Sequence, residues 1–276
     1  MSFQMAAFVS GVVWSRRDDG IRCGSFRSGR HSRSATQWTM SNVLIVNMPK
    51  GGHACIGHNL KGLLEQKGHV VFLDEQTAPS DMASKYSSQD VDIVIENKAK
   101  DWAEIDDIVQ FAKDKQVSQF LYVSSAGIYS PSEQLPYVES DKVKNSKAQG
   151  LVEKNLSESG LTFSCFRPMY IAGPTSSKRD YTDFFFDRMS RNQPIPIPGS
   201  GEQLTSVTDA RDVSAMVAAA VGASGAANQI FNCVSPRFIS FNGMAKACAR
   251  AMGVDPATLS LVHYDPKKLP ADVDSK

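Results

Sequence analysis

Short apolar runs alternate with segments of helical periodicity along the chain from residue 41. Residues 43–46 form a continuous apolar run, as a strand buried on both faces requires. Behind it, apolar residues recur at helical spacing from Ile56 to Leu64, and Gly68 is placed to end that helix. This alternation predicts an α/β fold with a doubly wound, mostly parallel sheet. Further strands are expected at 70–73, 93–95, 120–123, 163–166 and 230–234, and further helices around 105–112, 151–156, 213–221 and 241–252.

Two segments depart from this alternation. Residues 75–90 are polar and lack a clear period. Residues 194–199 read Pro-Ile-Pro-Ile-Pro-Gly, and because three prolines remove three hydrogen-bond donors, this segment cannot be a central strand. We therefore expect two structured parts. The first is a Rossmann-like domain over 41–174, and the second, 175–276, completes the sheet and forms a smaller subdomain.

Composition and charge narrow the class of protein. With 42% hydrophobic and 21% charged residues the chain is ordinary for a globular protein, and no apolar run is long enough to span a membrane. A net charge of +1 excludes a chain that is basic throughout, so nucleic acid would have to bind at a local patch. Residues 1–40 carry six Arg, no Lys, two Asp and seven Ser. This composition predicts an organelle transit peptide over 1–40, with a disordered basic arm as the alternative.

The five cysteines are scattered and show no metal-ligand spacing. Cys165 and Cys233 lie inside apolar, strand-like runs and are expected to be buried as small hydrophobic residues. This use of cysteine is typical of a reducing compartment.

The turn after the first strand is rich in glycine. Read as G-x-x-G-x-x-G, it supplies Gly51, Ala54 and Gly57, with Gly52 beside the first position. Glycines at such positions let the backbone turn, admit a pyrophosphate and pack a helix closely on a strand. Asp74 follows at the end of the second strand, where a carboxylate binds a ribose hydroxyl of NAD.

Two interpretations of this turn stay open. Gly51, Gly52, Gly57 and Asp74 form a candidate NAD site. Alternatively the turn serves packing alone, since the methyl group of Ala54 stands where a pyrophosphate would approach.

Several motifs together resemble the extended short-chain dehydrogenase/reductase superfamily over residues 42–265. They are the glycine-rich turn, Ser-Ser-Ala-Gly-Ile-Tyr at 124–129, Arg-Pro at 167–168, Ile-Ala-Gly-Pro at 171–174 and Arg-Asp-Val at 211–213. Within that superfamily the chain is most similar to the chloroplast stem-loop-binding proteins. The segments that carry this narrower likeness are 43–47, 51–54, 124–129, 185–188, 194–201, 230–235 and 262–267.

The resemblance implies a Rossmann-type fold with a small, truncated C-terminal subdomain, because the family continues beyond the last residue of this chain. It implies a sheet without one edge strand, since the span from Asp74 to Asp92 is short for the strand and helix that the superfamily places there. It also implies an RNA-binding protein of the chloroplast stroma, with Mg²⁺-dependent endoribonuclease activity on stem-loops. The implied partners are plastid ribosomal and messenger RNA, ribosomes or their precursors, and a second copy or a paralogue, with no membrane.

Dehydrogenase chemistry in the superfamily needs a tyrosine and a lysine four residues apart on one helix, because the lysine lowers the pKa of the phenol. Only Tyr264 has a lysine at that spacing, Lys268, and Pro266 between them breaks a helix. The expected place holds Asn145 and Gln149. We therefore exclude classical dehydrogenase or epimerase chemistry.

In an open α/β sheet, ligands bind beyond the carboxyl ends of the strands. There, basic side chains could take phosphates and two tyrosines, Tyr129 and Tyr170, could stack on unpaired bases. For each residue the alternative is an ordinary solvated side chain. The candidate RNA-binding residues are Lys50, Lys98, Lys100, Tyr129, Arg167, Tyr170 and, on a later helix, Arg188.

Cleavage of RNA would need a metal and a base. Glu96 and Asp101 are the candidate Mg²⁺ ligands. Asp101 also begins an Asp-x-x-Glu pattern, which is typical of a helix cap. His53 is the candidate base, or a histidine that only satisfies its loop. Ser125 is either a surviving catalytic residue or a hydrogen-bonding residue at a strand end.

Four functions compete at this point. The leading one is stem-loop RNA binding with endoribonuclease activity. The others are an NAD-binding epimerase or dehydratase acting on a nucleotide sugar, a non-catalytic RNA or ribosome scaffold, and an NAD-sensing regulator.

Overall fold

The computed structural model describes residues 40–50, 52–146, 148–173 and 181–268. The expected transit peptide lies outside these residues except for Met40, and so does the expected boundary at residue 174. No helix in the described ranges is long and apolar enough to cross a membrane.

A six-stranded parallel sheet forms the centre of the fold, in the order β10-β5-β4-β3-β1-β2. The chain adds β2 on one side of β1 and then returns to place β3 on the other, so strand order reverses between β1 and β3. The predicted α/β fold with its doubly wound, mostly parallel sheet is thereby confirmed. The strands are β1 (Asn42–Asn47), β2 (Val70–Asp74), β3 (Ile93–Asn97), β4 (Gln119–Val123), β5 (Phe163–Pro168) and β10 (Gln229–Cys233).

Among the described strands the sheet ends at β2, which pairs with β1 alone. Between β2 and β3 the chain forms a single 3-10 turn, η1 (Pro79–Asp81), and one short helix, α2 (Met82–Lys85), with no strand. The expectation of a missing edge strand is confirmed. Its consequence is that the β2–α2 turn, rather than another strand, lies beside the carboxyl ends of β1 and β3.

Helices cover both faces of the sheet, and alternate strand residues divide between them. On one face Val43 and Ile45 pack with α1 (Gly52–Gln66) and α6 (Ala210–Ala220). On the other face Leu44 and Val46 pack with α2, α3 (Asp106–Asp114) and α4 (Ala148–Glu158). β3 and β4 are buried along their whole length, which explains the continuous apolar runs in their sequences.

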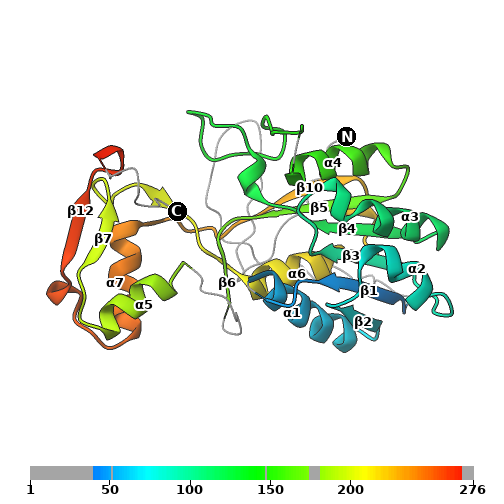
Figure 1. Ribbon diagram of the computed structural model, residues 1–276, viewed down its shortest axis with the longest axis horizontal. Helices are drawn as coiled ribbons and strands as arrows, with labels where there is room; N and C mark the ends of the chain where they lie inside the picture. Colours follow the sequence, from blue (N-terminus) through cyan, green and yellow to red (C-terminus); the bar gives the residue numbers. More distant parts are fainter. Residues whose placement is uncertain (1–39, 51, 147, 174–180, 269–276) are drawn as a thin grey trace, which may run out of the picture.

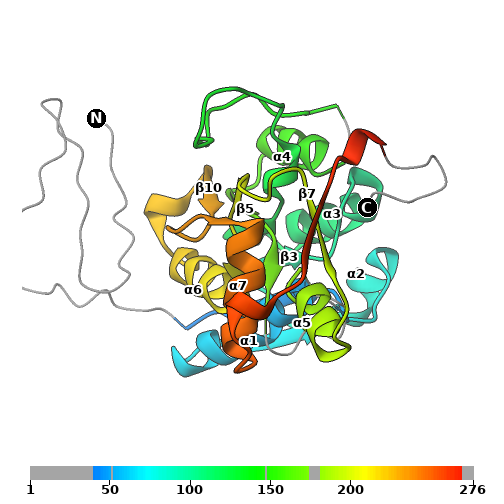
Figure 2. The same cartoon turned by 90° about the vertical axis from the view of Figure 1, so that its left-hand side faces the viewer.

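A second, smaller lobe lies to one side of the sheet in Figure 1. In the perpendicular view of Figure 2 it lies in front of the sheet. Its core includes Phe185, Ile195, Ile197 and Met244. The proline-rich segment forms β7, whose one partner in the sheet topology is β12, so its prolines remove no hydrogen bond from a central strand. The lobe contains α5 (Asp183–Ser190), β7 (Ile195–Pro198), α7 (Phe241–Ala251), η5 (Pro256–Thr258) and β12 (Leu261–Tyr264).

The remaining described elements are short. Two more strand pairs join β6 (Ile171–Ala172) to β9 (Thr208–Asp209) and β8 (Leu204–Thr205) to β11 (Ile239–Ser240). Four further 3-10 turns are η2 (Trp102–Glu104), η3 (Ala126–Ile128), η4 (Ser224–Ala226) and η6 (Pro266–Lys268).

The four described cysteines are buried and form no disulfide. Cys165 and Cys233 both have exposed fractions of 0%, which confirms that they pack as small hydrophobic residues.

Candidate functional site

The end of β1 is locked to the start of α1 by the side chain of Asn47. Its Nδ2 donates to the carbonyl oxygen of Ala54 at 3.3 Å and to Glu75 Oε1 at 3.0 Å. A β-carbon at Gly57 would lie 2.2 Å from Asn47 Cγ, so only glycine fits there. Gly57 therefore serves the close packing of helix on strand. Gly52 is the first residue of α1, and Gly51 lies outside the described residues.

His53, in the first turn of α1, has a defined tautomer. Asn97 Nδ2 donates to Asn47 Oδ1 and to the carbonyl oxygen of His53, both at 2.6 Å, which leaves Asn97 Oδ1 as an acceptor. His53 Nδ1, 3.0 Å from that oxygen, must therefore be the donor. Burial lowers the pKa of His53, the hydrogen bond that His53 donates to Asn97 raises it, and the charge of Lys100 lowers it further, with a net lowering. The imidazole is thus neutral at pH 7, with its Nε2 lone pair free to accept a proton.

Asp74, expected to bind a ribose, has both oxygens engaged within the protein. Oδ1 accepts from the backbone N–H groups of Gln76 and Thr77 at 3.1 and 2.9 Å, and Oδ2 accepts from Lys85 Nζ at 2.8 Å and Tyr86 Oη at 2.9 Å. Burial alone would raise the pKa of Asp74, but Lys85 and the two backbone donors hold it well below its usual value. In the structure this carboxylate stabilises the turn between β2 and α2. Its cofactor role stays a prediction.

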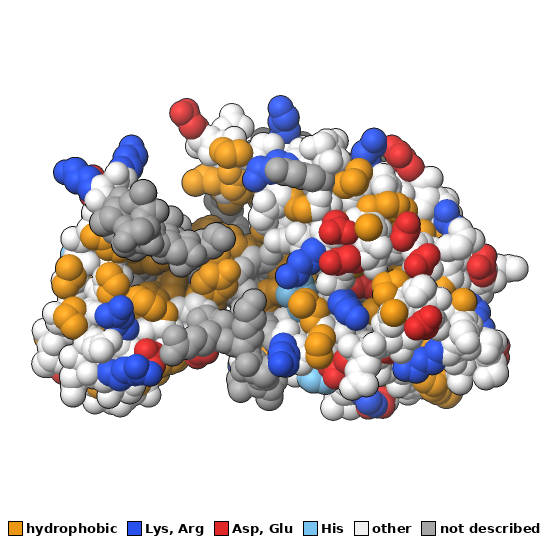
Figure 3. Space-filling view, in the orientation of Figure 1, with side chains coloured by type: hydrophobic (Ala, Val, Ile, Leu, Met, Phe, Trp, Pro, Cys, Tyr) orange, Lys and Arg blue, Asp and Glu red, His pale blue; other side chains and the backbone are white. Residues whose placement is uncertain are grey.

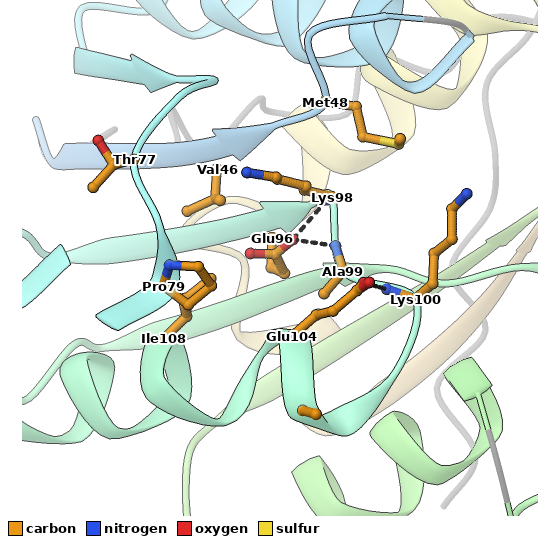
Figure 4. A pocket seen from close by; sticks show the side chains of 11 residues that line it. Val46, Met48, Thr77, Pro79, Glu96, Lys98, Ala99, Lys100, Glu104 and Ile108 are labelled. Carbon is orange, nitrogen blue, oxygen red and sulfur yellow. Dashed lines mark hydrogen bonds between the residues drawn. The ribbon is translucent and has the colours of Figure 1, made fainter. Parts of the chain in front are cut away.

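Glu96 lies at the floor of a cavity of about 410 Å³ that opens beyond the carboxyl ends of β1 and β3 (Figure 4). Its side chain is fully buried, and Oε1 accepts from the backbone N–H groups of Lys98 and Ala99 at 2.6 and 2.7 Å. Oε2 is buried and has no hydrogen-bond partner among the residues that the structure describes. Burial raises the pKa of Glu96 to about 7. An unpaired carboxyl oxygen in such a place is unusual, because buried polar atoms are nearly always hydrogen-bonded.

The two candidate Mg²⁺ ligands do not form a metal site. Asp101 is exposed and caps η2 by accepting from the N–H of Glu104, while Glu104 accepts from the N–H of Lys100. This confirms the capping pattern that the sequence indicated. In the described part of the chain no three His, Cys, Asp or Glu side chains form a group that could hold a metal. Glu96 and Asp101 thus accept hydrogen bonds from different backbone N–H groups, and in the described residues no third ligand accompanies them.

Three lysines lie around this end of the sheet. Lys50 and Lys100 are exposed and Lys98 is half-buried. Within the described ranges none of them forms an ion pair with a carboxylate. Lys and Arg side chains are visible on the larger lobe beside the hollow that separates it from the smaller one (Figure 3). These uncompensated charges could bind phosphate groups.

The structure corrects the expectation that Arg167 and Tyr129 face RNA. Arg167 is 2% exposed, and it donates to Glu153, to Tyr129 Oη at 2.7 Å and to the carbonyl oxygen of Glu139 at 3.1 Å. The ring of Tyr129 is also buried and stacks on Tyr137, with 4.8 Å between centroids. Both side chains stabilise the protein interior, because their polar groups are already hydrogen-bonded to other residues of the chain. Glu153 was not among the predicted site residues. Its position within the apolar pattern of the helix nevertheless indicates a buried side chain that needs a basic partner.

The other expected site residues are dispersed. Tyr170 is 40% exposed and lies edge-on to Tyr181. Arg188 belongs to α5 in the smaller lobe, where its guanidinium lies over the ring of Phe184 and donates to the carbonyl oxygen of Pro194. Ser125 accepts from the N–H of Gly127 at 3.1 Å, which is the hydrogen-bonding role expected at a strand end.

The structure also defines the place where a dehydrogenase would carry its tyrosine and lysine. Asn145 precedes α4, which begins at Ala148, while Gln149 lies within the helix. Tyr264 ends β12, whereas Lys268 ends the separate 3-10 turn η6. No helix therefore presents a tyrosine–lysine pair at either of these two places.

Comparison with known proteins places these features in a family context. The model of the NAD dependent epimerase/dehydratase family matches residues 100–233. The chloroplast stem-loop binding protein of 41 kDa b of Arabidopsis thaliana is 32% identical over 188 residues, which are 67% of this chain and 48% of that protein. The chain thus spans about half the length of this relative.

Solved structures share the fold at low sequence identity. An epimerase of Methanothermobacter thermautotrophicus superposes with a TM-score of 0.68 at 18% identity, covering 82% of this chain and 80% of that one. The UDP-glucose 4-epimerase of Thermotoga maritima gives a TM-score of 0.67 at 18% identity, with 82% and 86% covered. The enzyme WbmH of Bordetella bronchiseptica, solved with NAD⁺, gives 0.65 at 18% identity, with 84% and 88% covered.

Proposed function

The chain is related to the chloroplast stem-loop binding proteins, and from this relationship we propose that it is a chloroplast protein that binds stem-loop RNA. The observation that carries the proposal is the 32% identity over two thirds of the chain to a protein of that name. The stroma is the proposed location, and plastid ribosomal or messenger RNA is the proposed partner, alone or within ribosomal particles.

The charges at the strand ends support this proposal. Lys50, Lys98 and Lys100 are basic groups without a carboxylate partner in the described residues, and Lys98 and Lys100 line the cavity above Glu96. Phosphate groups bound there would release counterions, so affinity should fall steeply with salt. A loop of RNA suits this edge better than a straight duplex, because its unpaired bases can turn toward a cavity.

The test is a binding titration of the full chain with a labelled stem-loop RNA, a duplex of the same stem without a loop, and an unstructured strand of the same composition. We expect the stem-loop to bind more tightly than both controls, with a linear loss of log affinity against log salt. Equal binding of all three RNAs, or no binding at all, would refute the proposal.

Cleavage of RNA is a separate activity, and the structure offers it less support. His53 has a neutral imidazole with a free Nε2 that could act as a base, but no carboxylate cluster for Mg²⁺ accompanies it in the described residues. We therefore propose binding as the main activity. Incubation of the same stem-loop with and without Mg²⁺ reports cleavage through shortened products, and a chain that binds without cutting is a scaffold.

A second candidate function is binding of NAD and a nucleotide sugar. The match of residues 100–233 to the epimerase/dehydratase family favours it. The absence of a tyrosine–lysine pair at the helix α4 position and the engaged carboxylate of Asp74 weaken it. Calorimetric titration with NAD, followed by UDP-glucose, distinguishes this function, since it requires saturable binding of the dinucleotide.

A further inference from the structure

The cavity above Glu96 combines apolar walls with one unsatisfied acceptor. Its walls include Val46, Pro79, Ala99, Ala103 and Ile108. A volume of about 410 Å³ lies within the range of pockets that bind small ligands. Figure 4 shows Glu96 between these walls, with one carboxyl oxygen bound to the backbone of the β3–η2 loop. A flat, largely apolar ring with a single outward donor would match both the walls and the acceptor.

The charged side chains at the rim of the cavity indicate which kind of molecule carries such a ring. Lys98 and Lys100 line the cavity together with Glu96 and Glu104, and neither lysine forms an ion pair with a carboxylate in the described ranges. An aromatic ring that is flanked by phosphates is a nucleotide. Because the lysines stand at the opening and the carboxyl group at the floor, the base would enter and the phosphates would stay outside.

From this arrangement we propose that the cavity takes one unpaired, amino-bearing base of the RNA loop, whose exocyclic amine donates to Glu96 Oε2. The proposal rests on the proposed RNA binding and adds its base preference. Adenine, cytosine and guanine each carry an exocyclic amine. Uracil has no exocyclic amine, and its donor on this edge is the ring N3–H. A hydrogen bond from N3–H would bring the two flanking carbonyl oxygens against the carboxylate. The cavity should therefore discriminate against uridine.

The hydrogen bonds of Glu96 make one substitution unusually informative. In Glu96→Gln, the side-chain oxygen must stay where Oε1 accepts from two backbone N–H groups. The amide nitrogen then occupies the position of Oε2. An acceptor becomes a donor without a change of shape, so the variant should lose the preference for an amine-bearing base, because every base presents an acceptor.

Ala103 provides an independent block. It is exposed in η2 and lines the cavity, so Ala103→Trp would fill the cavity without touching the Glu96 hydrogen bonds. Ala257 offers a matched control, because it is the exposed middle residue of η5 and follows an aspartate cap in the same way. Ala257→Trp places the same bulk on the smaller lobe.

The experiment measures fluorescence anisotropy of the full chain at pH 8 with three labelled stem-loop RNAs. The stems and loop lengths are identical, and the loops contain only adenosine, only cytidine or only uridine. We expect the wild type to bind the adenosine and cytidine loops about tenfold more tightly than the uridine loop, the effect of one hydrogen bond to a charged group. Glu96→Gln should remove this preference. Ala103→Trp should abolish it, and Ala257→Trp should leave it unchanged.

The outcomes separate this inference from the proposed function. If no stem-loop binds, RNA binding itself is refuted. If all three loops bind wild type equally, or if Ala103→Trp keeps the preference, the base pocket is refuted while RNA binding stands. Titration with AMP tests whether the base in the cavity comes from a free nucleotide instead of the RNA loop. AMP that binds the wild type while the loops stay indistinguishable would assign the cavity to a free nucleotide and overturn the proposal.

Discussion

Arg167 on β5 and Glu153 on α4 form a two-point ion pair in the interior of the larger lobe. Nε donates to Oε1 at 3.1 Å and Nη2 donates to Oε2 at 2.6 Å, with the side chains 2% and 5% exposed. Such a pair joins the helix to the sheet only while both partners are present, since a buried charge without its partner is costly.

Glu153→Gln should therefore destabilise the protein by about 3–5 kcal/mol, the usual cost of breaking a buried pair from one side. Urea unfolding monitored by circular dichroism measures the change in the free energy of unfolding. Glu158→Gln, on an exposed position of the same helix, is the control and should change it by less than about 0.5 kcal/mol. Equal stabilities of the two variants would contradict the assigned role.

Removal of two exposed lysines tests the RNA surface. Lys50→Ala combined with Lys100→Ala should weaken binding of stem-loop RNA and reduce the slope of log affinity against log salt by about 1.4–1.8, because two phosphate contacts are lost. The matched control is Lys113→Ala combined with Lys154→Ala, which removes the same charge from exposed positions of α3 and α4. If the control pair reduces the slope as much as the test pair, net charge rather than this surface governs binding.

Glu96 should make stability depend on pH. Burial raises its pKa from 4.5 to about 7, so the folded chain binds a proton that the unfolded chain releases. The stabilisation is complete below pH 4.5 and is lost as the pH rises through 7. Glu96→Gln should remove this contribution, which amounts to about 3 kcal/mol at one pKa unit per 1.36 kcal/mol.

The measurement is the free energy of urea unfolding of wild type and Glu96→Gln between pH 5 and 8. Lys98, Lys100, Glu104 and Tyr122 surround this carboxyl group, and because both proteins carry them, the difference between the two profiles isolates the contribution of Glu96. The two pH profiles should diverge as the pH rises from 5 to about 7 and stay a constant distance apart above it. Parallel profiles would show that Glu96 does not titrate there.

Restoring the catalytic side chains should not restore a dehydrogenase. In Asn145→Tyr combined with Gln149→Lys, the new tyrosine would precede the first residue of α4, Ala148, while the lysine would lie inside the helix. The two groups would lack the one-turn spacing that lowers the phenol pKa. We expect no reduction of NAD⁺ with UDP-glucose as substrate, followed by absorbance at 340 nm. Turnover by the double variant would mean that helix α4 extends further when the tyrosine is present.

The periodicity of apolar residues by itself determined the larger part of the fold. Residues 43–46, 93–95 and 120–123 had to be buried strands, because continuous apolar runs fit only a sheet that is covered on both faces. The prolines at 194–198 excluded a central strand, and the cap at Asp101 followed from its spacing to Glu104. These features depend on neighbours in the chain, so sequence alone is enough to find them.

The site depended on contacts between residues far apart in sequence. Nothing in the sequence shows that Arg167 reaches Glu153 and Tyr129, or that Asp74 is saturated by Lys85 and Tyr86. The sequence does not distinguish a charged residue that faces water from one that faces a buried partner. Only the packing of helices on the sheet decides how many hydrogen-bond partners it has, and within the described part of the chain this packing leaves Oε2 of Glu96 without one.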